Sequence, residues 1–226
     1  MAEQSKIWFL EEVDLFDILC PSKTPNMEAK HPPNQFKKDE FIYFPDQPSS
    51  SIYMIADGRV KIGSFVEDGK ENIKAILGKG EIFGELALAG ESKRSDFAQA
   101  LDNNTRICSM GIDDLQDLMK DNQTLALKIF KIMGLRLRKM ERKITSLVFK
   151  DARTRIVEFL KDMAEERGQK VGFETMIKNH LTHKDIASLT GTSRQTVTTV
   201  LNELRESNII NFDRRRILIR DVAKLA

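Results

Sequence analysis

The chain of 226 residues contains little cysteine, with Cys20 and Cys108 as its two thiols. Two cysteines cannot build a disulfide framework, and an iron–sulfur cluster takes about four cysteine ligands. The composition therefore predicts two reduced thiols and argues against an iron–sulfur cofactor.

Long apolar runs are also missing, since no stretch approaches the roughly 18 consecutive apolar residues of a membrane span. The first 16 residues carry acidic groups inside their apolar stretch and no basic region before it, unlike a signal peptide. These two absences predict a cytoplasmic protein without a membrane partner.

Sequence motifs of catalysis are absent as well. There is no nucleophile–base set, no metal triad and no P-loop, and the glycine cluster Gly78-Lys79-Gly80 is typical of a turn. His180 and His183 lie three residues apart without a cysteine or an acidic residue at ligand spacing. We expect solvated histidines at a helix start, no metal site and no enzyme.

Charge of either sign is not in large excess, because the whole chain carries a formal net charge of +2. Residues 151–226 carry a net +3 and the remainder a net −1. This mild asymmetry permits nucleic-acid binding at the C-terminal end and does not establish it.

The first half of the chain has the texture of a β-domain. Short runs rich in Ile, Val, Phe and Tyr alternate with turn signals such as Asp57-Gly58. This spacing predicts a sandwich or barrel with strands at 40–44, 51–55, 59–66, 72–77 and 105–110. Before them we expect a helix over 3–20 and an irregular, proline-rich arm over 21–35 that holds His31.

After residue 112 the apolar period becomes helical. Apolar residues recur at steps of three and four, which predicts an a/d seam on a helix of about 35 residues. One interpretation is a dimer seam, and the alternative is a long amphipathic helix packed on its own domain. The seam residues are Phe130, Met133, Leu137, Met140, Ile144 and Leu147.

The stretch 181–210 predicts a helix-turn-helix after a further helix at about 152–166. Thr182 and Asp185 resemble a capping box, Gly191 supplies the turn, and Ser193 caps a second helix. The core positions of that second helix are Val197, Val200, Leu201 and Leu204.

The outward positions of the second helix have the residue types that read bases in a major groove. Arg bonds guanine, Gln bonds adenine, and the methyl group of Thr contacts thymine. A hairpin wing follows, with arginines at its tip that suit phosphate. The alternative is an ordinary helical hairpin with a solvated arginine turn. The DNA-binding candidates are Ser193, Arg194, Gln195, Thr198, Thr199, Arg214, Arg215 and Arg216.

Four sequence features in this order resemble the Crp/Fnr (cyclic-AMP receptor protein) family of bacterial transcription regulators. They are FGELAL at 83–88, Arg94-Ser95, LVFKDARTRI at 147–156 and GTSRQTV at 191–197. The resemblance implies an α+β fold with three parts. These are a cyclic-nucleotide-binding-like β-roll of the jelly-roll type at 1–111, a dimerisation helix at 112–150, and a winged helix-turn-helix DNA-binding domain at 151–226.

The resemblance also implies a ligand site at Gly84, Glu85, Leu86, Arg94 and Ser95. By this resemblance, Glu85 accepts a ribose 2′-hydroxyl, Arg94 pairs with a cyclic phosphate and Ser95 donates to it. The alternative is that Glu85 and Arg94 bond each other or the backbone and staple the loop.

Three departures from the family pattern leave the effector open, and one of them is a loop between Glu85 and Arg94 that is one residue shorter than in the best-known nucleotide-binding member. Asp96 follows Ser95, where the family commonly has a small neutral residue, and Met140 and Glu141 stand where small hydroxyl residues often reach the purine. The effector could be cyclic AMP, another small molecule, a haem or redox signal, or none.

The resemblance implies a homodimer that binds a palindromic operator in double-stranded DNA and contacts RNA polymerase, with half-sites about one helical turn apart. The alternative from another class is a nucleotide-sensing module that regulates another protein and uses the helix-turn-helix only as scaffold.

Overall fold

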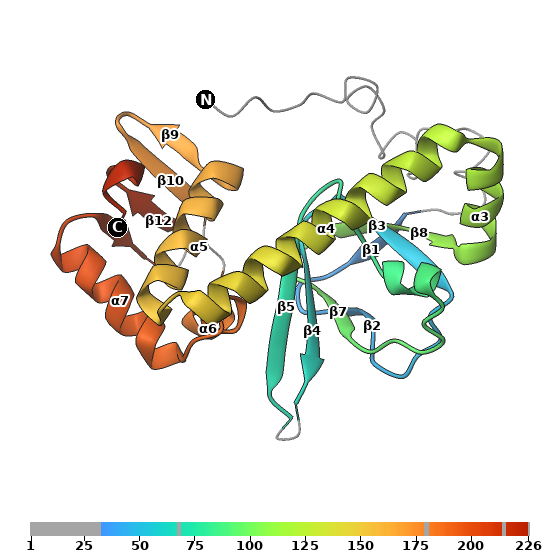
Figure 1. Ribbon diagram of the computed structural model, residues 1–226, viewed down its shortest axis with the longest axis horizontal. Coiled ribbons are helices and arrows are strands. Elements are labelled where there is room, and N and C mark those ends of the chain that lie inside the picture. Colours follow the sequence, from blue (N-terminus) through green and yellow to red (C-terminus); the bar gives the residue numbers. More distant parts are fainter. Residues whose placement is uncertain (1–32, 67–68, 179–180, 214–215, 226) are drawn as a thin grey trace. The chain divides into compact units, whose positions relative to one another are not determined.

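The computed structural model of the protein describes residues 33–66, 69–178, 181–213 and 216–225 (Figure 1). The described chain divides into two compact units, one ending at Arg136 and the other beginning at Leu137. Several sequence predictions lie outside the described residues, namely the helix over 3–20, Cys20, His31, His180, Arg214 and Arg215.

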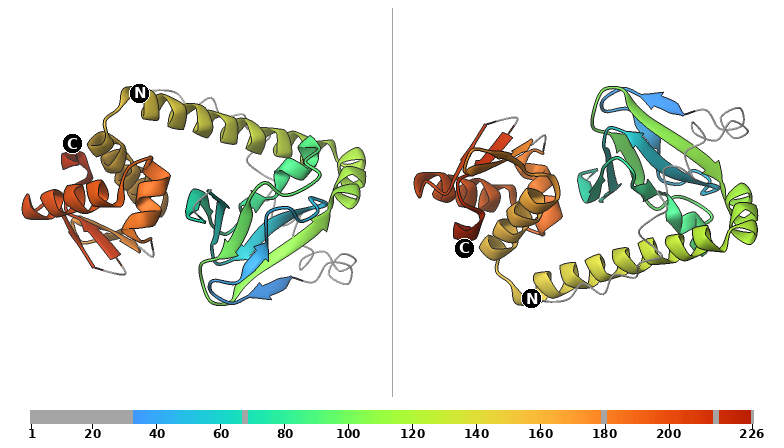
Figure 2. Two further views of the ribbon diagram at one scale, coloured as in Figure 1. Left: turned by 90° about the horizontal axis from the view of Figure 1, so that it is seen from below. Right: turned by 90° about the horizontal axis from the view of Figure 1, so that it is seen from above.

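The first unit contains two four-stranded antiparallel sheets, visible in Figures 1 and 2, with strand orders β1-β8-β3-β6 and β2-β7-β4-β5. The strands are β1 (Asn34–Phe36), β2 (Phe41–Tyr43), β3 (Ser51–Asp57), β4 (Val60–Phe65), β5 (Glu71–Leu77), β6 (Ile82–Phe83), β7 (Phe97–Ala100) and β8 (Thr105–Gly111).

Strand alternation places one apolar layer on each side of the first sheet. Ile55 and Ile107 point into a core shared with Val60 and Ala98 of the second sheet. Met54 and its neighbours on the other face pack against helices α3 (Ile112–Asp121) and α4 (Gln123–Phe149), which cover that face in Figure 2. The period of two along β3 therefore builds both cores.

The five strands predicted from sequence are confirmed with small shifts of their ends. The arm expected over 21–35 is wrong at its end, because β1 begins at Asn34 and pairs with β8. The alternation of apolar residues along 59–66 predicts Val66 on the same buried face as Val60 and Ile62, which is wrong. Val66 follows the strand and is exposed, and the pairing register shifts at a bulge between Ile62 and Gly63.

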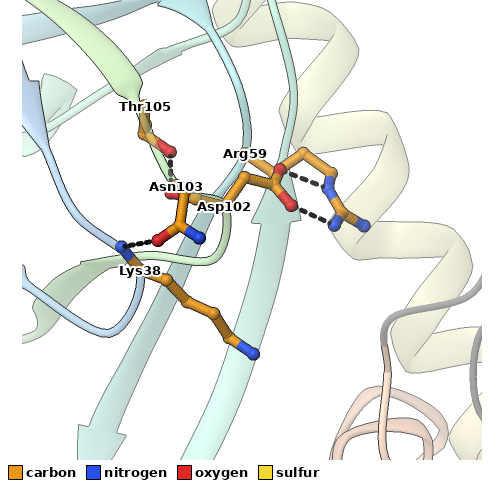
Figure 3. Close-up of polar contacts among 5 residues, drawn as sticks. All are labelled: Lys38, Arg59, Asp102, Asn103 and Thr105. Atoms are coloured by element: carbon orange, nitrogen blue, oxygen red, sulfur yellow. Dashed lines mark hydrogen bonds and ion pairs between the residues drawn. The ribbon is translucent and has the colours of Figure 1, made fainter.

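A polar network fixes the turn that leads from β7 to β8 (Figure 3). The Arg59 guanidinium holds the Asp102 carboxylate through two bonds, from Nε at 2.8 Å and Nη2 at 2.6 Å. Thr105 Oγ1 donates to the Asp102 carbonyl at 2.8 Å, and Asn103 Oδ1 accepts from the Lys38 backbone N at 3.2 Å. A fork of this kind is among the stronger polar contacts in proteins, and here it joins β4 to the turn.

The single helix of about 35 residues predicted after residue 112 is wrong. The chain breaks at Asn122 into α3 and the 27-residue α4. Asn122 Oδ1 accepts a hydrogen bond from the Leu125 backbone N at 3.0 Å and so caps the new helix. This break allows Leu115 of α3 and Leu125 of α4 both to be buried against the β-roll.

The second unit packs three helices on a sheet of order β11-β12-β10-β9, around a core of its own. The first of these helices ends at Arg167, close to the predicted end at 166, with Gly168 as its C-cap, whereas β9 and β10 were not predicted. The elements are α5 (Ala152–Arg167), β9 (Gln169–Val171), β10 (Glu174–Lys178), α6 (His183–Thr190), α7 (Arg194–Glu206), β11 (Ile210–Phe212), β12 (Arg216–Ile219) and the short η4 (Val222–Lys224).

Within the part of the chain that the structure describes, no helix has the length and apolarity needed to cross a bilayer. The same residues contain no group of three or more His, Cys, Asp or Glu arranged to hold a metal ion.

Candidate nucleic-acid interface and effector site

Local hydrogen bonds build the helix-turn-helix as the sequence predicts. Thr182 Oγ1 accepts from the Asp185 backbone N at 3.2 Å, and Asp185 Oδ2 accepts from the Thr182 N at 2.8 Å. Gly191 ends α6 with a φ of 62°, and Ser193 Oγ accepts from the Thr196 N at 3.0 Å to begin α7. Both caps and the left-handed turn are therefore confirmed.

Helix α7 separates a packing face from an outward face. The predicted core residues Val197, Val200, Leu201 and Leu204 are buried. Arg194, Gln195 and Thr199 are exposed, and Thr198 is half-buried. Three of the predicted base-reading side chains therefore lie on one accessible face of a helix whose other face is anchored.

Arg155 of α5 holds the turn between the two helices, a role that sequence reasoning missed. Its Nε donates to the Thr190 carbonyl at 2.8 Å and its Nη2 to the Gly191 carbonyl at 3.0 Å. Nη1 donates to the Lys150 carbonyl at 2.6 Å. One charged side chain thus fixes the end of α6, because its donors form a rigid fork.

The wing is the β11–β12 hairpin, in which Phe212 pairs with Ile217. Arg216 is bonded within it, since its backbone N and its Nε donate to Asp213 at 3.0 and 2.9 Å. Of the three arginines predicted to meet phosphate, Arg216 therefore shapes the turn, although both partners remain largely exposed. An exposed pair of this kind is weak enough for the arginine to exchange Asp213 for a phosphate.

His183 is not the solvated histidine that we expected. It is half-buried at the start of α6, and its Nδ1 lies 2.8 Å from Thr198 Oγ1 on α7. Its ring also meets the Phe212 ring edge-on, with centroids 6.1 Å apart. Burial and the neighbouring Arg194 charge lower the pKa of His183. His183 thus contacts α7 and β11 from α6.

Two of the predicted ligand residues, Glu85 and Leu86, lie on a short 3₁₀ helix, η3 (Glu85–Ala89). The helix is flanked by Gly84 and Gly90, both with positive φ. A Cβ on Gly84 would lie 2.9 Å from Arg94 Nη1, so only glycine allows this approach. Leu86 is 45% exposed on η3.

Arg94 points inward and is 2% exposed. Its Nη1 donates to the Gly84 carbonyl at 3.0 Å and its Nη2 to the Ser51 carbonyl, whereas Nε has no partner among the described residues. The guanidinium lies over the rings of Tyr43 and Tyr53, at 4.6 and 5.5 Å from their centroids. Arg94, the residue predicted to bind a phosphate, is therefore already engaged by backbone and aromatic groups.

Glu85 and Arg94 do not bond each other. Glu85 forms an ion pair with Arg136 of α4, and Arg136 also donates to the Ile82 carbonyl. Ser95 donates its backbone N to Glu91 Oε1 at 3.0 Å. Burial by itself raises the pKa of Glu91, but hydrogen bonds from Ser95 and Ser49 outweigh it, so that the pKa is lowered. Glu85, Arg94 and Ser95 are thus each engaged by other groups within the chain.

Asp96 adds a carboxylate beside the Arg94-Ser95 pair. Tyr43 Oη donates to Asp96 Oδ1 at 3.1 Å, and Lys74 Nζ lies 3.7 Å from Oδ2. Burial raises the pKa of Asp96, and burial together with Asp96 raises the pKa of Tyr43. A negative charge at this position opposes a bound phosphate.

The outward side of α4 carries an apolar strip. Phe130 is 72%, Leu137 59%, Met140 63%, Ile144 60% and Leu147 44% exposed. We call these five residues the α4 strip. The sixth predicted seam residue, Met133, is partly buried against the core of the first unit. Met133 therefore follows the alternative of a helix packed on its own domain, and the dimer seam along the α4 strip stays a prediction.

Two family models match separate parts of the chain. A model of the cyclic nucleotide-binding domain matches residues 33–122, and a model of the Crp-like helix-turn-helix domain matches residues 154–226.

Similar whole proteins span nearly the same length. The CRP-like cAMP-activated global transcriptional regulator of Mycobacterium tuberculosis is 28% identical over 217 residues, which is 96% of each chain. The global nitrogen regulator of Nostoc sp. is 28% identical over 185 residues, covering 81% of this chain and 83% of the relative. The solved structure of a CooA mutant from Carboxydothermus hydrogenoformans has a TM-score of 0.78 and 28% identity, covering 95% of this chain and 94% of that one.

Proposed function

From the premise that this chain belongs to the Crp/Fnr family of transcription regulators, we propose that it binds operator DNA as a homodimer. Members of this family are regulators and not enzymes. The observation that carries the proposal is the capped helix α7, whose buried face anchors it and whose outward face holds Arg194, Gln195 and Thr199.

The chemistry of the outward face of α7 fits base recognition. Arg194 lies at the N-terminal end of α7, where a recognition helix meets base edges, and its guanidinium can bond guanine through two atoms. Gln195 can bond adenine in the same manner, and the Thr199 methyl suits thymine. Ser193 keeps its hydroxyl on the helix cap, so we assign it a positioning role.

The α4 strip supports a symmetric dimer. It is apolar and exposed over about five turns of one helix, and its residues follow the spacing of a coiled-coil seam. The strip ends at Leu147, next to Gly191 of the turn, where an added Cβ would lie 2.5 Å from Leu147 Cδ2. A dimer formed along α4 would set two recognition helices for half-sites about one helical turn apart. A dimer bound to such an operator would contact RNA polymerase.

The first unit is the proposed effector domain. By the sequence resemblance, Glu85, Arg94 and Ser95 would be its ligand-binding residues, and one relative is named for activation by cAMP. A second candidate is regulation without an effector. It is favoured by the engagement of Arg94 with two carbonyls and of Glu85 with Arg136, and by the Asp96 carboxylate.

The proposed function is tested first by DNA binding. Sites selected from random duplexes should be palindromic, and affinity should fall steeply with salt because phosphate contacts release counterions. Arg194→Ala should relax the preference at one guanine per half-site, whereas Arg167→Ala, an exposed arginine at the end of α5, should not. Salt-independent or absent DNA binding would instead support a module that regulates another protein.

The two effector alternatives are separated by calorimetric titration with cyclic AMP and cyclic GMP. Binding that is lost in both Arg94→Ala and Glu85→Ala supports the effector domain. Thermal unfolding of each variant is measured alongside, because Arg94 also bonds the backbone. Absence of binding to the wild type favours the second candidate or another ligand.

A further inference from the structure

We propose that His183 is a specificity-determining residue of the DNA interface, acting through Thr198. His183 holds the Thr198 hydroxyl within the protein, so that Thr198 presents its methyl group to a base, and His183 takes up a proton when DNA binds. The inference rests on the proposed role of α7 in reading the major groove.

The two bonds of the Thr198 hydroxyl fix the tautomer of His183. Thr198 Oγ1 lies 2.9 Å from the Arg194 carbonyl and 2.8 Å from His183 Nδ1. A carbonyl oxygen can only accept, and a hydroxyl has one hydrogen to donate. Thr198 therefore donates to Arg194, and His183 must donate through Nδ1–H. The neutral ring then keeps its second nitrogen, Nε2, as the site that can gain a proton.

This arrangement decides what Thr198 can offer to DNA. Its hydroxyl hydrogen is used on the Arg194 carbonyl, and the His183 proton occupies a lone pair of the same oxygen. The side chain then has no hydrogen left to donate to a base, and the half-buried residue offers its γ-methyl and one lone pair of the oxygen. A methyl group makes an apolar contact with the C5-methyl of thymine and cannot hydrogen-bond any base. Thr198 is thus assigned to thymine, whereas a free threonine hydroxyl would tolerate several bases.

The charged groups around His183 bear on whether it takes up a proton when DNA binds. From α7, the Arg194 charge acts on the ring directly. From β11, the Phe212 ring contacts the His183 ring. The guanidinium of Arg205, on α7, lies 5.1 Å from the centroid of the Phe212 ring. Asp213, which follows Phe212, is bonded to Arg216.

On α6 itself, Asp185, two residues after His183, is used in the capping box, and the adjacent Lys184 is exposed. Burial and the Arg194 charge lower the pKa of the ring in the unbound protein, whereas DNA phosphates attract the added positive charge. Binding should therefore raise the pKa of His183.

The affinity for DNA should depend on pH but the base preference should not, because protonation at Nε2 leaves the Nδ1–H bond to Thr198 intact. Affinity should rise as pH falls from the raised pKa of His183 in the DNA complex to its lowered pKa in the free protein, and should level off below the latter. A rise of about one pKa unit on binding gives at most about tenfold per subunit. The thymine preference should stay the same over this range, at roughly fourfold for one buried methyl group.

The test combines binding-site selection with fluorescence anisotropy at fixed salt, from about pH 5.5 to about pH 8.5. Thr198→Val keeps the methyl group and should keep the thymine preference, and Thr198→Ser keeps the hydroxyl and should lose it. His183→Asn can still donate to Thr198 but cannot titrate, so it should keep the preference with a weaker pH dependence. His183→Ala should lose both properties.

The inference is overturned if Thr198→Ser retains the thymine preference, or if His183→Asn shows the same pH profile as the wild type. Either result, with salt-dependent DNA binding preserved, leaves the proposed function standing. A wild-type protein that does not bind DNA overturns both.

Discussion

Lysine substitutions on the α4 strip would test the proposed dimer directly. In the double variant Leu137→Lys, Ile144→Lys, two side chains that are 59% and 60% exposed in the single chain become charged. If the strip is a seam, both side chains lose an apolar partner, and two lysines from each subunit are brought together. We expect a monomer.

The magnitude of this effect follows from the exposed area. Fully burying a Leu or Ile side chain is worth about 1.5–3 kcal/mol, and about three-fifths of each side chain is open to a partner. Four such side chains in a dimer therefore represent about 4–7 kcal/mol, before any repulsion between the lysines. That corresponds to a dissociation constant weaker by about 10³ to 10⁵.

Sedimentation velocity over a range of concentrations measures this change. Leu135→Lys is the matched control, because Leu135 is 48% exposed on the same helix and outside the strip. The control should remain dimeric, and circular dichroism should show unchanged helix content in all proteins. A double variant that sediments as a dimer, or a wild type that is monomeric at tens of micromolar, would refute the seam.

Three further changes test other parts of the structure. Asp96→Asn should raise the melting temperature at neutral pH, because a carboxyl with a raised folded pKa costs stability once it is ionised. The gain should shrink as pH falls towards about 4, which thermal scans at several pH values would show. Ser193→Ala should cost about 1 kcal/mol in urea unfolding through loss of the α7 cap, with Ser207→Ala at the other end of α7 nearly neutral. Arg155→Met should cost about 2–3 kcal/mol and weaken DNA binding, since three carbonyls lose a charged donor; unchanged unfolding would contradict this.

The helix-turn-helix could be predicted from sequence because its determinants are local. The capping box joins two residues three apart, and the second cap also spans three residues. Gly191 directly follows Thr190, the last residue of α6. Hydrophobic periodicity then identified which side of α7 is buried. Each capping signal lies within one turn of helix and the periodicity lies within α7 itself, so no knowledge of the tertiary fold was needed.

The effector region could be located from sequence, but its contacts could not. The partner of Glu85 is Arg136, and that of Arg94 includes the Ser51 carbonyl, both distant in the chain. Strand β7 escaped because all four of its residues are buried, so it lacks an alternating pattern. The break at Asn122 escaped because the apolar period continues across it.

His183 shows how a local motif can hide a tertiary role. Its place after the Thr182 cap is typical of an exposed first turn, and its partner Thr198 lies on the next helix. The signal that could have found it is geometric. Once two helices are known to cross at a tight turn, the start of the first lies close to the second turn of the other.

The division of α7 into two faces has a consequence for how such a regulator diversifies. The residues that keep the helix folded, from the Ser193 cap to Leu204, are different from the residues that face outward. A duplicated gene could therefore acquire a new set of promoters through a few codon changes, with no loss of protein stability. The same separation makes α7 a practical place for rewiring a genetic circuit.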